Sequence, residues 1–266
     1  MIDALRHHWP EYLMEAALLG IFMISACTFG VLLGHPASPI VRMIDSPWRL
    51  RALMGIAMGA TAAGLIYSPW GKRTGAHFNP SVTLTFLRMG KIAPFDALFY
   101  VVAQFAGGVA GVLVAALALG RRLADPSVNY VATLPGPAGP RAAFLAETAI
   151  SFVLMVVVLG VSNARRAARF TGLCCAALVA SCIAFESPIS GMSMNPARTF
   201  GSALPAGAWG GLWIYFTAPP FGMFLAAQAY LALRGARAVH CAKLHHAGDQ
   251  RCIFRCGYAM AAMETV

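Results

Sequence analysis

Two short strings, each built around Asn-Pro, carry the residues whose chemistry is easiest to interpret. Each string opens an apolar stretch of about ten residues, which as a helix would be ~15 Å long and cross about half a bilayer. Asparagine is a strong helix N-cap, and proline fits the first helical turn. Each string therefore predicts a short helix that begins inside a membrane, with an amide at its positive end. The strings are Asn79-Pro80-Ser81 and Asn195-Pro196-Ala197.

The two strings belong to an internal repeat. Residues 75–83 match residues 191–199 in the pattern Gly-x-x-apolar-Asn-Pro-small-x-Thr. With three apolar runs in each half, the second half must insert upside down relative to the first. Short interrupted segments at matching places in inverted halves predict a substrate path at the midplane of the membrane. The other matched pairs are Tyr100 with Tyr215, Gly107 with Gly222, and Glu15 with Glu147.

The composition places these strings in a membrane. Hydrophobic residues make up 59% of the chain, charged residues only 11%, and the mean hydropathy is +0.67. These values exclude an ordinary soluble or disordered protein, and the apolar runs do not alternate as β-barrel strands do. The predicted fold is an all-α membrane protein with six transmembrane helices, two re-entrant half-helices and an inverted internal repeat. The predicted spans are 13–33, 52–67, 95–119, 142–161, 172–185 and 211–233.

The net charge and the lack of enzyme motifs limit which functions remain. The net charge of +10 fits loops that face anionic lipid rather than nucleic acid. Placing both termini in the cytoplasm puts most Lys and Arg residues inside, which predicts a multi-pass protein of the cell membrane. No nucleophile–base pair, phosphate loop or cofactor motif appears, so no enzyme is predicted. The predicted membrane domain spans 1–238, with halves near 10–125 and 140–235, and a cytoplasmic tail spans 239–266.

Over roughly residues 10–233 the sequence resembles the major intrinsic protein family, the aquaporins and aquaglyceroporins. The paired Asn-Pro strings, residues 190–201 and the two repeat-related glutamates carry this resemblance. It implies a homotetramer with one pore per subunit, and a passive channel for water and small neutral solutes that excludes protons and ions. Ser81 stands where the family usually has alanine.

The resemblance also implies a selectivity filter near the outer mouth. Its charged member is Arg198, and the other positions map to Met58, Ile183 and Met192. Water-selective members typically place histidine where Ile183 stands, and glycerol-selective members place glycine there. An arginine facing three apolar side chains leaves a second function open: a facilitator of hydrogen peroxide, urea, ammonia or glycerol with low water flux.

The ionisable residues in the apolar runs admit two interpretations. Glu15 and Glu147 would be costly if unpaired in lipid. We expect each to accept hydrogen bonds from unwound backbone ahead of a half-helix; the alternative is a proton relay in a coupled transporter. His77, two residues before Asn79, is expected to line the pore or anchor its loop rather than bind a metal.

The tail contains a separate group of residues that could bind zinc. Its spacing is not that of a standard zinc finger, and the alternative is a basic tail whose thiols are incidental. The channel itself is expected to need no cofactor. The candidate ligands are Cys241, His245, His246, Cys252 and Cys256.

Overall fold

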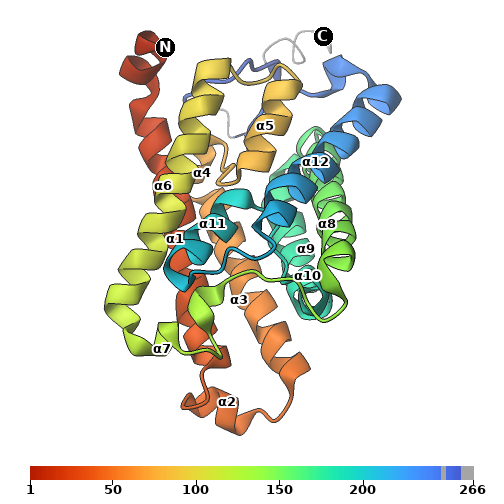
Figure 1. Ribbon diagram of the computed structural model, residues 1–266. Coiled ribbons are helices and arrows are strands. Elements are labelled where there is room, and N and C mark those ends of the chain that lie inside the picture. Colours follow the sequence, from red (N-terminus) through yellow and green to blue (C-terminus); the bar gives the residue numbers. More distant parts are fainter. Residues whose placement is uncertain (247–249, 259–266) are drawn as a thin grey trace.

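A computed structural model describes residues 1–246 and 250–258 as a bundle of long helices (Figure 1). Within this part of the chain, six helices are long and apolar enough to cross a membrane. The predicted all-α membrane fold is therefore confirmed. The six are α1 (Ile2–Gly34), α3 (Pro47–Tyr67), α6 (Pro94–Leu119), α8 (Gly139–Ser162), the segment Ala168–Phe185 that contains α9 (Thr171–Phe185), and α12 (Leu212–Arg234).

Two half-helices lie within this bundle. Helix α5 (Pro80–Arg88) and helix α11 (Pro196–Ala206) each begin at the proline of an Asn-Pro string, with the asparagine as N-cap. Helix α5 packs against α6 and α12, and α11 packs mainly against α6. Their N-terminal ends meet, and from that junction they run toward opposite ends of the bundle (Figure 1).

Glycines allow the long helices of each half to approach closely. A Cβ atom on Gly107 of α6 would lie 2.0 Å from the carbonyl oxygen of Ala16 in α1. A Cβ atom on Gly222 of α12 would lie 2.2 Å from the carbonyl oxygen of Thr148 in α8. These glycines are a matched pair of the repeat, and each faces the residue that follows a repeat glutamate. Small residues at such crossings let membrane helices pack backbone to backbone.

Helix α1 begins eleven residues earlier than the sequence predicts, at Ile2 rather than at residue 13. Its polar first turns do not end the helix, because their side chains find partners on neighbouring segments. Glu11 pairs with Arg73 at 2.9 Å, and the Tyr12 hydroxyl donates to Asp96 at 2.6 Å. The short elements are α2 (Pro39–Met43), α4 (Pro69–Thr74), α7 (Arg121–Ala124), α10 (Ser187–Ser190), η1 (Asn129–Val131), η2 (Ala168–Phe170) and η3 (Ala236–Ala238).

The N-terminus and the described residues of the tail lie at one end of the bundle, here called the terminal face; α2 and α7 lie at the opposite face (Figure 1). The described part of the tail packs against the bundle, because its apolar side chains join the core cluster that contains Phe86 and Tyr100. The buried tail residues of this cluster are Val239, Cys241, Ala242, Leu244 and Phe254.

Candidate functional site

A cavity of about 240 Å³ lies between the two halves. Both asparagine caps line it at the junction of α5 and α11. Arg51 and Ser187 line its part toward the opposite face, and Leu244 of the tail lines its part toward the terminal face. Side chains from both halves therefore enclose one elongated space that passes the two helix N-termini.

The two caps hold the junction together reciprocally. Asn79 Nδ2 donates to the carbonyl of Met194 at 2.8 Å, and Asn195 Nδ2 donates to the carbonyl of Phe78 at 2.8 Å. Each Oδ1 accepts from the first turn of its own half-helix, Asn79 from Ser81 N and Asn195 from Ala197 N. An amide nitrogen carries two hydrogens, so each asparagine keeps one for the cavity that it lines.

Glu15 and Glu147 fix the loops ahead of the half-helices. Glu15 accepts from the backbone N–H groups of His77 and Phe78, at 3.1 and 2.7 Å. Glu147 accepts from the equivalent N–H groups two and one residues before Asn195, at 2.6 and 2.8 Å. Both carboxylates are fully buried and neither lines the cavity. This geometry fits the structural interpretation of the two glutamates rather than a proton relay along the pore.

The same loops carry matched backbone strain. Ala76 and Met192 have φ values of +55° and +52°, a left-handed conformation that residues other than glycine seldom adopt. The two tyrosines of the repeat hydrogen-bond to the backbone two residues before these strained positions. The Tyr100 hydroxyl donates to Thr74 O at 2.9 Å, and the Tyr215 hydroxyl donates to Ser190 O at 2.6 Å. The strain persists because buried hydrogen bonds over-determine both loops.

All four residues of the expected filter line the cavity: Met58, Ile183, Met192 and Arg198. Among the described residues, no atom accepts a hydrogen bond from the buried Nη1 of Arg198. The guanidinium thus offers an unused donor to the space that three apolar side chains border. Arg51 and Met54, which the sequence analysis did not single out, line the cavity beside them.

His77 anchors its loop to the tail while it lines the cavity. Its Nε2 lies 2.7 Å from the carbonyl oxygen of Ala242, so this nitrogen carries the proton and donates. Its Nδ1 lies 3.1 Å from the Thr83 hydroxyl. The ring is stacked between Phe86 and Phe254, at centroid distances of 5.2 and 5.4 Å. His77 therefore lines the cavity and ties the loop ahead of α5 to the tail.

Two buried polar side chains differ from what the sequence analysis expected. The Ser81 hydroxyl is buried but has no partner among the described residues, and Ser81 does not line the cavity. Gln104 was missed: its Nε2 donates to Glu15 Oε2 at 2.9 Å and to Thr83 Oγ1 at 3.0 Å. A lone amide in the apolar run 95–119 was the available signal for it.

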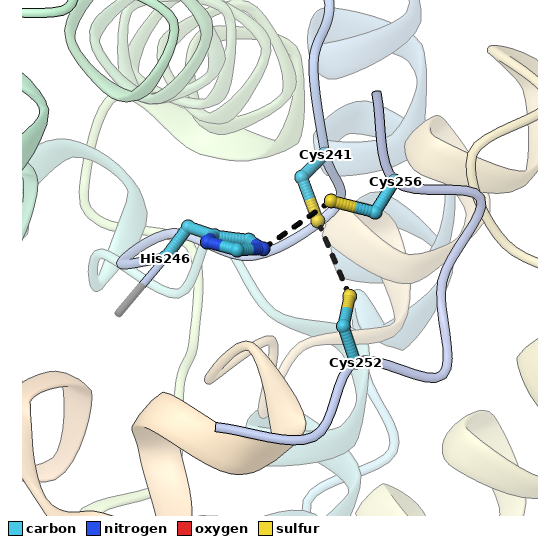
Figure 2. A group of neighbouring side chains, drawn as sticks. All are labelled: Cys241, His246, Cys252 and Cys256. Atoms are coloured by element: carbon cyan, nitrogen blue, oxygen red, sulfur yellow. Dashed lines mark hydrogen bonds between the residues drawn. The ribbon is translucent and has the colours of Figure 1, made fainter. Parts of the chain in front are cut away.

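The structure brings four of the five tail candidates together (Figure 2). His245 is not among them, because its ring packs edge-on against Tyr67 at a centroid distance of 5.1 Å. That expectation is corrected: adjacent histidines on an extended chain point to different sides. Within the group, the hydrogen bond from the Cys241 thiol lowers the pKa of the Cys252 thiol. The four are Cys241, His246, Cys252 and Cys256.

Residues 7–230 match the family described as Major intrinsic protein. The chain belongs to this family. Aquaporin NIP1-2 of Oryza sativa subsp. japonica is 40% identical over 163 residues, which are 60% of this chain and 54% of that protein. Aquaporin NIP1-3 of the same plant is 39% identical over 181 residues, 67% of this chain and 61% of that protein. The chain thus spans somewhat more than half the length of these curated relatives.

A solved member of the family has the same fold. The X-ray structure of the aquaglyceroporin from Plasmodium falciparum aligns with a TM-score of 0.71 over 83% of this chain and 94% of that one, at 18% sequence identity. At this identity the likeness supports the fold of this major intrinsic protein alone. The family resemblance on which the sequence analysis relied is confirmed.

Proposed function

We propose that this major intrinsic protein is a passive transmembrane channel that conducts water and small neutral solutes and excludes protons and ions. The reciprocal hydrogen bonds of Asn79 and Asn195 inside a continuous cavity carry the proposal. Each half-helix N-terminus contributes about half a positive charge, and the two fields add at the junction. Together they oppose cations and hydronium at the junction.

The donors at the junction give a mechanism for proton exclusion. A water molecule that accepts from both asparagine amides has its own two hydrogens directed along the pore, away from the junction. It cannot receive a proton on its oxygen at the same time, so a chain of waters loses its continuity as a proton wire. The filter then selects by size and polarity: Arg198 supplies the donor, and apolar side chains set the aperture.

The same filter favours a second candidate, a facilitator of uncharged solutes such as hydrogen peroxide, urea, ammonia or glycerol with low water flux. Met58 and Met192 are flexible side chains, and Ile183 offers no hydrogen bond where water-selective relatives typically have histidine. Stopped-flow measurements on proteoliposomes separate the two functions. High osmotic water permeability, with or without solute entry, supports the first function, and low water permeability with fast solute entry supports the second. Conduction of neither would overturn both.

The assembly and its placement belong to the same proposal. The bias of Lys and Arg residues favours both termini in the cytoplasm of a cell-membrane protein. The apolar outer faces of the long helices, with exposed side chains such as Leu113 and Leu145, suit contact with lipid or with neighbouring copies in a homotetramer. Cross-linking in lipid and protease access from each side of sealed vesicles test these two points.

A further inference from the structure

The thiol and imidazole group of the tail has the shape of a closed metal site (Figure 2). One ligand atom from each of the four side chains lies within 4.8 Å of every other. Cys241 and His246 come from the first described stretch of the tail, residues 240–246, and Cys252 and Cys256 come from the second, residues 250–257. All seven cysteines of the chain are free thiols, so these three are available as ligands.

The separations suit a tetrahedral ion better than a disulfide. Cys241 Sγ and Cys252 Sγ are 3.6 Å apart, and Cys256 Sγ is 3.2 Å from His246 Nε2. A disulfide would need about 2.05 Å between sulfurs. Tetrahedral zinc, with bonds of about 2.3 Å to sulfur and about 2.0 Å to nitrogen, places its ligand atoms about 3.5–3.8 Å apart. Small shifts of the side chains would seat the ion.

We propose that Cys241, His246, Cys252 and Cys256 bind one zinc ion and that this ion fastens the tail over the terminal-face end of the pore. Three thiolates and one imidazole form a donor set typical of structural zinc, with no position left for water or substrate. The ring of His246 stacks on Tyr258 at 4.4 Å, and the Tyr258 hydroxyl donates to Ser162 O at 2.8 Å. This packing orients the imidazole from behind, as partners outside the ligand shell do in zinc sites.

The local charge also fits. Lys243 is only 2% exposed, and its Nζ donates to the carbonyls of Lys72 and Arg251, at 2.9 and 2.7 Å. Among the residues that the structure describes, no carboxylate pairs with it. A zinc ion with three thiolates and a neutral imidazole carries one net negative charge. The buried cation next to Cys241 and the metal centre would therefore compensate each other.

The described part of the tail is an irregular segment that individual hydrogen bonds and side-chain packing hold against the bundle. Residues 240–246 and 250–257 form no helix or strand, and an irregular segment loses much entropy when it is ordered. Yet Leu244 N donates to Gly75 O at 3.1 Å, and the Leu244 side chain lines the cavity. Phe254 stacks on His77 beside it. A metal that joins the two stretches of the tail would hold both contacts at once.

The first test is the metal content of the full-length protein, purified under reducing conditions without chelators and loaded with zinc. We expect about one zinc per chain, reduced at least tenfold in Cys252→Ser/Cys256→Ser and in Cys241→Ser. His245→Ala and Cys174→Ser are matched controls that should keep the zinc. Cobalt in place of zinc should give the intense visible bands of tetrahedral thiolate coordination. Absence of bound zinc, a Cys241–Cys252 disulfide in its place, or equal zinc in all variants would overturn the site.

The second test asks whether the metal holds the tail down. Trypsin can cut after Arg251 and Arg255, and we expect cleavage there to become at least tenfold faster when a chelator removes zinc from the parent. In Cys252→Ser/Cys256→Ser the fast rate should appear without chelator, while the size-exclusion profile and helical content stay those of the parent. Equal cleavage rates with and without zinc would show that the ion does not fasten the tail. Neither readout depends on whether the pore conducts water.

Discussion

Asn79 and Asn195 each hold the chain at the residue that precedes the other: Asn79 donates to Met194 O and Asn195 to Phe78 O. Each asparagine therefore serves both half-helices through its two amide atoms. It caps its own half-helix through Oδ1 and anchors the opposite half through Nδ2. The position of each donor in the pore is consequently set by the other half of the protein.

Replacing either asparagine by aspartate tests this junction. Asn79→Asp or Asn195→Asp removes the pore donor and sets a carboxylate oxygen against a carbonyl oxygen. With a loss of about 1.5 kcal/mol for one hydrogen bond, water flux should fall about tenfold, and cation or proton leak should rise. Stopped-flow light scattering and a pH-sensitive dye in proteoliposomes measure the two effects. Asn129→Asp in the connector is the control, and parent-like flux in both junction variants would refute the donor mechanism.

The buried glutamates should act on stability and not on proton coupling. Glu147→Gln places an NH₂ group against the N–H groups of Ser193 or Met194, which leaves a buried donor unpaired at a cost of about 1–3 kcal/mol. We expect a lower unfolding temperature in detergent, with Asp45→Asn as an exposed control. Uptake by the parent should not respond to an imposed pH gradient. A gradient-dependent flux that Glu147→Gln abolishes would instead establish the relay.

The filter should be governed by Arg198. Arg198→Ala removes the only charge among the four filter residues and widens the aperture, so solutes such as urea and glycerol should enter faster relative to water. Ile183→His adds a donor opposite the arginine and should raise the ratio of water to solute permeability. Arg121→Ala, an exposed arginine of α7, serves as control. If the ratio is unchanged in both filter variants, the constriction lies elsewhere in the cavity.

The tail should limit entry from the terminal face. Leu244→Ala shortens a side chain that lines the cavity without touching the four thiol and imidazole groups. We expect osmotic water permeability to rise, by about twofold or more if this end of the pore is limiting. Leu233→Ala, at a position 84% exposed on α12, should change nothing. A parent-like flux in Leu244→Ala would show that the tail lies beside the path and does not narrow it.

Close packing in the second half depends on a single glycine. Gly222→Ala would press a methyl group onto the Thr148 carbonyl, and overpacking of this kind costs about 1–3 kcal/mol. At Gly160 of α8 an added Cβ meets nothing within 4 Å, so Gly160→Ala is the matched control. Thermal unfolding in detergent should separate the two variants. Equal stability would mean that α8 and α12 can move apart at no cost.

The main architecture could be predicted because its signals are local. Apolar runs mark the spans, and Asn-Pro marks the start of each half-helix, since capping and the first-turn proline act within a few residues. The start of α1 could not be placed, because Glu11 and Tyr12 are retained in the helix by Arg73 and Asp96. Those partners are distant in sequence and follow no periodic pattern.

The arrangement of the tail side chains could be predicted even less well than the start of α1. Its composition indicates metal ligands, but no periodicity tells which way an extended chain turns each side chain. His245 and His246 are chemically equal in the sequence; the ring of Tyr67 beside one and the thiol of Cys256 beside the other distinguish them in the structure. The stacking of Phe254 on His77 likewise depends on tertiary packing that the sequence does not display.

The crossed hydrogen bonds of the junction have a consequence for biogenesis. The acceptor for Asn79 is the carbonyl of Met194, which the ribosome adds more than a hundred residues later. During that interval α5 has no counterpart, and its amide and positive end must rest against water, lipid or the translocation machinery. Closure of the junction is therefore a late event that reports the arrival of a correctly inverted second half. A chain interrupted before α11 would leave its first half open to quality control.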